Sequence, residues 1–323
     1  MAIEIWIADP SGTKFYIPPV EEEIEWTTER KGTPGKLSFK VLKDEVLEVS
    51  EGSVVQLREN GNGLFFGFVF KQQRSKEPII TVTAYDQLRY LKNKDTFVYE
   101  NKTADQFIWM LASDYSLNVG ILEDTGYRIA SRVEEDTSLF DMIQSALDLT
   151  LTNTGNLFVL FDEFGKLTLK SLASMRVGTP DAYLMVDEET SESFDYTSSI
   201  DDNTYNKIVL KNETTKKDFV VAHDLENIKR WGTLVYTDTY KEGENGQAKA
   251  DALLRLYNKK TRNLKLTNVL GDNRVRAGSM IVVNLDLGDI KLKNFMLVEK
   301  CKHIYKESEH WMDLTLRGGE FIA

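Results

Sequence analysis

The chain has 323 residues, of which 41% are hydrophobic and 28% are charged, a composition typical of folded globular proteins. Because this length exceeds that of a usual single domain, two or three domains are expected. A net charge of −11 lacks the Lys and Arg surplus that binding to phosphates requires, which argues against sequence-specific nucleic-acid binding. The single cysteine, Cys301, excludes an internal disulfide and a cysteine-rich zinc site, and it fits synthesis in a reducing cytoplasm.

The N-terminal sequence MAIEIWIADPSG lacks the basic and apolar regions of a secretory signal, and we expect it to form a first strand. The longest apolar run, LFFGFVF at 64–70, has 7 residues, whereas a membrane-spanning helix needs about 20. We therefore expect no membrane segment.

Residues 1–92 show the alternation of half-buried antiparallel strands. In the segment 36–43, Leu37, Phe39 and Val41 share one face and polar residues share the other. The segment 79–85 alternates in the same way. These patterns predict a first β-barrel-like domain.

Residues 93–195 contain two helical patterns. In the first, apolar residues recur at helical spacing on one stripe, namely Ala104, Phe107, Ile108, Leu111 and Tyr115. Thr103 and Gln106 form a capping-box pattern at its start. The second pattern begins at Thr137 or Ser138, and its apolar stripe consists of Leu139, Met142, Ile143, Ala146 and Leu147.

Two strands around an Asp-Glu-Phe-Gly turn follow at 156–172, so the middle segment is predicted to be an α+β domain with a small sheet. Strand patterns return in residues 196–323, together with one helix at about 244–260. The predicted fold is therefore mainly β with an α+β insert: two small antiparallel β-barrel-like domains, 1–92 and 196–323, flank a middle domain, 93–195, with two helices. No Pro/Ser-rich linker separates the three parts, so we expect them to pack together.

A weak internal repeat links the two β segments. In residues 52–85, a Gly-Ser pair precedes a strand, a Gly-rich turn at 60–63, a strand, a charged turn at 74–77 and another strand. Residues 278–316 follow the same order, with turns at 288–289 and 306–309. A repeated order of turns and strands suggests one supersecondary plan used twice, although β-meanders with Gly turns also recur by chance.

Six stretches of the sequence carry a resemblance to a known family: residues 26–41, EGSVVQL, LFFGFVF, the run from Tyr85 to Phe107, AGSMIVVNL and HWMDLTLRGGEFI. They resemble the baseplate hub proteins of contractile phage tails, defective prophages and tail-derived bacteriocins of Gram-positive hosts. The most specific part matches a turn of that family with the residues Tyr85, Asp86, Leu88, Arg89, Tyr90 and Leu91.

The resemblance implies a structural protein that acts mechanically, is not an enzyme and has no cofactor. It implies a homotrimer in which two barrel-like domains per subunit give pseudo-sixfold symmetry, so that the ring joins a sixfold tail tube to a threefold spike. The implied partners are the tube, spike, tape-measure and baseplate wedge proteins, in a tail baseplate whose parts are made in the bacterial host cytoplasm. A DNA-carrying phage and a DNA-free bacteriocin both fit.

The matched turn also has an interpretation from local physics alone. Tyr85 ends a strand, Asp86 caps or turns the chain, and Leu88 and Leu91 lie one turn apart on a short helix. Arg89 and Tyr90 either stabilise the fold or contact a neighbouring subunit, because both residue types are frequent in both settings.

The sequence contains few motifs that are typical of catalytic or cofactor-binding sites. No nucleophile elbow and no phosphate-binding loop occur, and GNGLFFG has neither the spacing nor the following helix of a dinucleotide turn. Cys301 and His303 point the same way on one strand, and His310 returns beside them, but no fourth ligand for zinc is evident, and the ordinary condition is a buried cysteine with surface histidines. We therefore expect no metal site.

Two acid clusters, Glu134-Glu135-Asp136 and Glu188-Glu189, are candidates for a glycosidase carboxylate pair, but adjacent residues in a strand face opposite ways. A tail-associated peptidoglycan hydrolase and a host-glycan binding module, suggested only by 34 aromatic residues, remain the alternative functions. If the chain is a hub, its acidity also predicts an acidic channel lining that repels DNA phosphates.

Overall fold

The computed structural model describes residues 2–9, 11–43, 47–76, 78–201, 203–240, 245–288 and 291–318. Contacts divide the chain into two compact units. One unit contains residues 1–194 and 265–323, and the other contains residues 195–264. The three-domain division drawn from the sequence is not tested by these units and stays a prediction.

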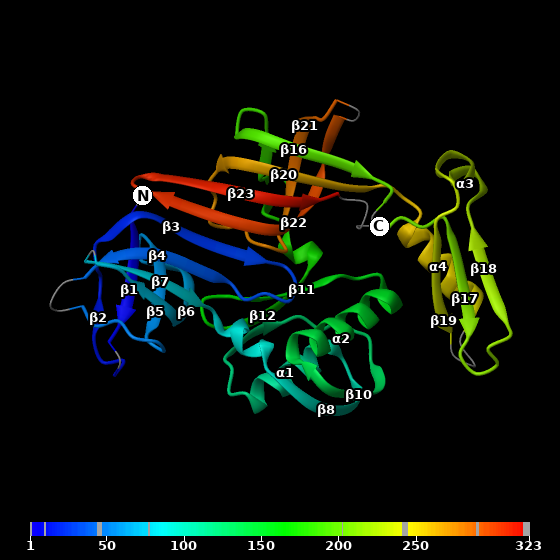
Figure 1. The fold of residues 1–323 in the computed structure, drawn as a ribbon, viewed down its shortest axis with the longest axis horizontal. Helices are drawn as coiled ribbons and strands as arrows, with labels where there is room; N and C mark the ends of the chain where they lie inside the picture. The colour runs from blue at the N-terminus through cyan, green and yellow to red at the C-terminus, as the bar shows by residue number, and fades with distance from the viewer. Residues whose placement is uncertain are drawn as a thin grey trace. The chain divides into compact units, whose positions relative to one another are not determined.

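The N-terminal β segment forms consecutive antiparallel strands (Figure 1). They are β1 (Ile3–Ala8), β2 (Phe15–Tyr16), β3 (Val20–Glu29), β4 (Lys36–Leu42), β5 (Val54–Glu59), β6 (Asn62–Arg74) and β7 (Ile79–Tyr85). Their order in the sheet is β3-β4-β7-β6-β5-β1-β2. Leu37, Phe39 and Val41 are buried in the core of this segment, as the alternation predicted.

The middle segment begins with the 3-10 helix η1 (Gln87–Lys92) and an antiparallel ribbon of β8 (Lys94–Lys102) and β10 (Ile129–Ser138). Helices α1 (Ala104–Asp114) and α2 (Leu139–Thr154) contact each other. They share a core with the hairpin of β11 (Phe158–Asp162) and β12 (Leu167–Ser171), and β9 (Val119–Leu122) adds a parallel strand to this small sheet. A second 3-10 helix, η2 (Leu172–Met175), follows.

Both predicted helices begin where the caps indicated. Thr103 is the N-cap of α1, and its backbone N–H donates to Gln106 Oε1 at 3.2 Å. Ser138 is the N-cap of α2, and its hydroxyl accepts the Asp141 N–H at 3.2 Å. The predicted apolar stripes are buried on both helices, apart from the half-buried Tyr115 that follows α1.

Most of the C-terminal strands extend the same sheet. The C-terminal strands are β13 (Gly178–Thr179), β14 (Ala182–Tyr183), β15 (Met185–Asp187), β16 (Ser191–Ser199), β20 (Thr261–Leu270), β21 (Met280–Asp286), β22 (Lys291–Lys306) and β23 (Glu309–Arg317). The order β16-β20-β23-β22 continues directly into β3. Figure 1 shows β22 and β3 side by side, although about 270 residues separate them in sequence. β13 and β14 form a separate two-stranded sheet, and β21 joins the large sheet by pairing with β22 and, in parallel, with β15.

The predicted repeat is confirmed by backbone geometry. Gly52 and Gly278 have φ values of +87° and +93°. The Gly52 N–H donates to Val69 O at 2.8 Å, and the Val69 N–H donates to the carbonyl of the following serine at 2.9 Å. The Gly278 N–H donates to Val298 O at 2.7 Å, and the Val298 N–H donates back in the same way at 2.9 Å.

The strands around these glycines correspond as well. The register with the next strand shifts after Val69 in β6 and after Val298 in β22, so a bulge falls at the same place in each copy. The strands β3-β4-β7-β6-β5 therefore correspond to β16-β20-β23-β22-β21. Part of the second turn, Asp289, lies outside the described residues.

The second unit is a three-stranded sheet with one covering helix. β17 (Lys207–Asn212) pairs antiparallel with β18 (Phe219–His223) and parallel with β19 (Val235–Tyr240). The predicted third long helix is α4 (Gly246–Tyr257), and it contacts β17 and β18 through a core that includes Ala250. The sequence patterns did not predict the short helix α3 (Leu225–Trp231), which Asp224 caps.

The fold class, mainly β with an α+β insert, is confirmed.

Candidate functional site

The matched turn connects the first β segment to the helices. Tyr85 ends β7, and Asp86 is the N-cap of η1. The Asp86 carboxylate accepts the Leu88 N–H at 3.1 Å and the Gly35 N–H at 2.9 Å. Leu88 and Leu91 are buried in the core of the two helices. The interpretation from local physics is confirmed for these residues.

Arg89 and Tyr90 contact strand β6 of their own chain. The Arg89 guanidinium lies 5.3 Å from the centre of the Phe70 ring, and the Tyr90 ring lies 6.1 Å from it. Phe70 also meets Tyr85, with the ring centres 5.6 Å apart. These aromatic contacts join the turn to the bulge of the first repeat. The alternative of an intersubunit contact for Arg89 and Tyr90 stays a prediction.

A buried charge cluster lies beneath this turn. It contains Asp86, Asp162 at the end of β11 and Arg276 before β21. Burial, followed by the charge of Asp162, raises the pKa of Asp86 well above its usual value. Burial also raises the pKa of Asp162 to about 6.

The Arg276 guanidinium stacks over aromatic rings and also donates a hydrogen bond. Its guanidinium lies 4.3 Å from the Phe161 ring centre and 5.8 Å from the Trp26 ring, and Nη2 donates to the Asp162 main-chain carbonyl at 2.8 Å. The neighbouring Ala277 N–H donates to Thr28 Oγ1 at 2.9 Å. Arg276 therefore fastens the second repeat to the middle segment, and its neighbour fastens it to the first.

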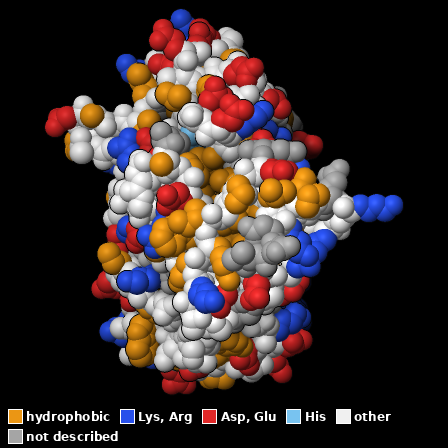
Figure 2. All heavy atoms as spheres, turned by 90° about the vertical axis from the view of Figure 1, so that its left-hand side faces the viewer, with side chains coloured by type: hydrophobic (Ala, Val, Ile, Leu, Met, Phe, Trp, Pro, Cys, Tyr) orange, Lys and Arg blue, Asp and Glu red, His pale blue; other side chains and the backbone are white. Residues whose placement is uncertain are grey.

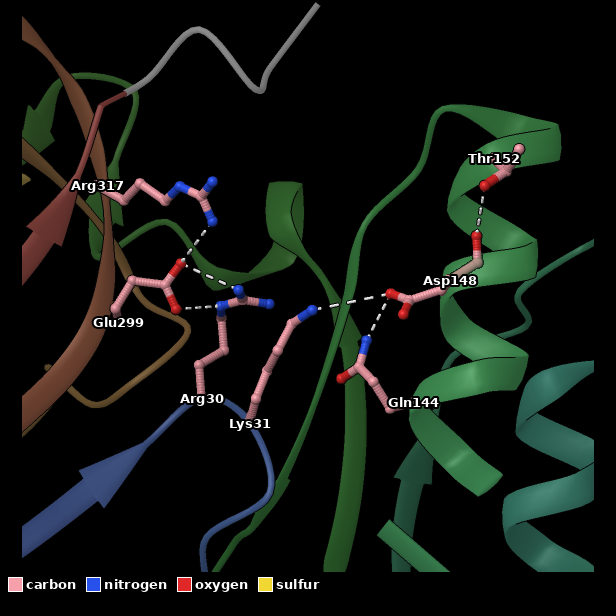
Figure 3. Close-up of polar contacts among 7 residues, drawn as sticks. All are labelled: Arg30, Lys31, Gln144, Asp148, Thr152, Glu299 and Arg317. Carbon is pink, nitrogen blue, oxygen red and sulfur yellow. Dashed lines mark hydrogen bonds and ion pairs between the residues drawn. The ribbon is translucent and has the colours of Figure 1, made fainter. Parts of the chain in front are cut away.

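A second polar network lies where β3 meets β22 (Figure 3). Arg30 follows β3, and its Nε and Nη2 donate to Glu299 at 2.7 and 3.0 Å. Arg317 Nη1 approaches the same carboxylate at 3.9 Å. Lys31 points the other way, toward Asp148 on α2, at 3.8 Å. Since the Arg30 side chain is only 7% exposed, its bidentate pair is shielded from water, whereas the Lys31 pair is not.

The three residues tested as zinc ligands do come together, but two of them satisfy each other. His303 Nδ1 and His310 Nε2 lie 2.9 Å apart, and His303 Nε2 lies 2.9 Å from the Val275 carbonyl and 3.3 Å from Cys301 Sγ. Both histidines are buried, so the expectation of surface histidines was wrong. Burial lowers the pKa of His303 to about 3 and that of His310 to about 4, and it raises the pKa of the Cys301 thiol. Among the described residues no His, Cys, Asp or Glu cluster has a metal-binding arrangement.

These features can be compared with known proteins. A family model described as YQBQ-like matches residues 24–317. The chain belongs to this family. Its relatives include YqbQ of Bacillus subtilis (strain 168), which is 30% identical over 307 residues, 92% of each chain. The phage-like element PBSX protein XkdQ of the same organism is 31% identical over 272 residues, 83% of this chain and 82% of XkdQ.

The fold of this YQBQ-like chain is also similar to that of a solved structure. The prophage MuSo2 43 kDa tail protein from Shewanella oneidensis superposes with a TM-score of 0.69, covers 97% of this chain and 98% of its own, and is 13% identical. The likeness establishes a shared fold. The predicted resemblance to tail proteins of phages and defective prophages is confirmed.

The acid clusters of this YQBQ-like chain do not form a carboxylate pair. Glu134 is buried and pairs with Arg132 at 2.9 Å, whereas Glu135 and Asp136 are exposed. Glu188 and Glu189 follow β15 in a turn. Asp86 and Asp162 are buried together, but neither lines the cavity of about 330 Å³ beside Arg276. Sequence reasoning missed Asp162 and Arg276, because no short motif joins residues so far apart.

Apolar side chains gather on one face of the N-terminal β segment (Figure 2). Phe15, Ile17 and Leu42 are exposed among the strands at this end. A hollow of about 470 Å³ lies between β1, the segment 17–20 and the end of β22. Exposed apolar side chains that gather on one face in this way are a feature of protein contact surfaces. Within the described residues, no helix is long and apolar enough to cross a membrane.

Proposed function

We propose that this chain is the central hub of a contractile-tail baseplate, a homotrimer that joins a sixfold tail tube to a threefold spike. The observation that carries the proposal is the internal repeat, in which Gly52 and Gly278 begin two copies of one strand plan. Three chains with two similar modules each present six similar surfaces on one side while keeping threefold symmetry. The family and its tail-protein fold support this assignment.

The role is structural rather than catalytic. The polar side chains that sequence reasoning considered for chemistry are used within the fold: Asp86 caps a helix, Glu134 pairs with Arg132, and His303 pairs with His310. Their hydrogen bonds and burial are those of groups that hold strands and segments together. The proposed partners are the tube, spike, tape-measure and wedge proteins of the tail, assembled from subunits made in the bacterial cytoplasm.

Native mass spectrometry of the purified chain, alone and mixed with the spike protein of the same tail, tests this proposal. We expect a trimer that is formed or strengthened when the spike is added. A chain that stays monomeric with the spike present would contradict the hub assignment. Zymography on peptidoglycan tests the enzymatic alternative, and we expect no clearing.

A further inference from the structure

One strand-to-strand seam joins the two repeats within the chain. Lys300–Lys306 of β22 pair antiparallel with Glu23–Glu29 of β3. The seam is charge-complementary: Lys300 Nζ lies 2.7 Å from Glu29 Oε1, and Lys302 pairs with Glu25. β3 carries five glutamates and no basic residue. The main-chain hydrogen bonds between β22 and β3 and the opposite charges of their side chains therefore hold the second repeat to the first.

The first repeat has the corresponding edge, and no described strand pairs with it. By the shared bulge position, Lys71 of β6 corresponds to Lys300 of β22. β5 pairs with β6 only as far as Phe68, so along Phe70–Arg74 no described strand occupies the edge that β3 occupies on β22. This free edge carries two exposed basic side chains, Lys71 and Arg74. In the shared register Gln73 takes the place of Lys302, so Lys71 is the one basic position that the two edges have in common.

The second repeat has an acidic strand, β16, with no described strand on its outer edge. β16 corresponds to β3 in the strand order, and β20 is its one neighbour among the described strands. β16 carries Glu192 and Asp195 and no basic residue, and its Phe194 is 44% exposed. An exposed strand edge is a ready template for another chain.

We propose that the Phe70–Arg74 edge of β6 pairs antiparallel with β16 of a second copy of this chain, repeating between subunits the seam that β22 and β3 make within one. This inference rests on the proposed hub function and specifies the contact by which copies join. Because a different surface is used on each side, the contact is head-to-tail, and such contacts close into a ring when the rotation permits. Main-chain hydrogen bonds supply the pairing, and the basic and acidic strands select the partner.

Engineered cysteines test the pairing. Lys71→Cys is combined in turn with a cysteine at each position from Ser193 to Ser199, and interchain disulfides are measured after mild oxidation of the purified chain with its spike protein. One β16 position should give the highest yield. When the first cysteine is moved to Gln73, the best β16 position should move two residues toward the N-terminus of β16, because antiparallel strands run in opposite directions.

Controls make the outcomes decisive. The pair Lys300→Cys and Glu29→Cys, directly opposed in the intrachain seam, should form a disulfide within one chain, so that no covalent dimer appears on a non-reducing gel. Native Cys301 is buried and stays in place. Register-independent yields, or yields no higher than for Lys71→Cys with Glu226→Cys on α3, would overturn the proposed edge. If trimers form without these crosslinks, the proposed hub function is supported and the proposed strand pairing is contradicted. If crosslinks form but the chain lies at the periphery of the tail, the strand pairing is supported and the hub function is contradicted.

Discussion

Gly52 and Gly278 occupy equivalent places in the two repeats but have different surroundings. Both have positive φ, where an added Cβ is strained. A Cβ on Gly52 would meet nothing within 4 Å, whereas one on Gly278 would lie 2.4 Å from Val159 Cγ1 in β11. The second glycine therefore has two constraints: its own turn and the close approach of the middle segment.

The substitutions Gly52→Ala and Gly278→Ala should separate these constraints. We expect Gly52→Ala to lower the free energy of unfolding by about 1 kcal/mol, from backbone strain alone. Gly278→Ala should lower it by about 3 kcal/mol, because Val159 must also move. Urea unfolding of both variants measures the difference, and equal losses would contradict the close packing of Gly278.

The buried histidines predict how stability depends on pH. The pKa of His310 is lowered to about 4 by burial, so in acid the unfolded chain takes up a proton that the folded chain does not. The contribution of neutral His310 to the free energy of unfolding is therefore full above about pH 6.5 and falls as the pH drops toward 4. His310→Gln should make this fall shallower in urea unfolding at stepped pH. His223→Gln, at an exposed position on β18, is the matched substitution against which the effect of His310→Gln is compared.

Asp162 should act in the opposite direction. Its pKa is raised by burial to about 6 in the folded chain, so there it holds a proton that the unfolded chain has lost between about pH 4 and 6. Its contribution to stability grows as the pH falls through 6. Asp162→Asn removes this gain and should make the acid loss steeper than in the unsubstituted chain. A shallower loss would show that Asp162 is ionised in its buried place.

At the scale of elements, the Arg30–Glu299 pair measures how firmly β22 is held to β3. A double-mutant cycle with Arg30→Ala and Glu299→Ala should give a coupling free energy of about 1 to 3 kcal/mol, since the pair is bidentate and shielded. The exposed Lys31–Asp148 pair, seen beside it in Figure 3, is the matched control and should couple by less than about 0.5 kcal/mol. Similar couplings would mean that the seam does not depend on this pair.

The sequence predicted elements better than the contacts between them. Periodicity and caps located α1 and α2, because a helix buries a stripe that is written locally. The β22–β3 seam was not predictable, since strand pairing across about 270 residues leaves no local pattern. Of the candidate site, the matched turn found Asp86, whereas Asp162 and Arg276 meet it only through the tertiary fold.

At the scale of the whole molecule, the repeat turns one chain into two similar modules joined by a seam. In the proposed ring, the free edges of β6 and β16 would extend the same plan from one chain to the next. Symmetry adaptation would follow from that proposed arrangement, because three copies would carry a sixfold pattern of modules.

Electron cryomicroscopy of an intact tail that contains this chain tests the central claim most directly. We predict three copies in a ring on the tail axis between tube and spike, with the two repeats of each copy alternating around it. A chain found at the periphery of the baseplate, or present on the axis in six copies, would contradict the account.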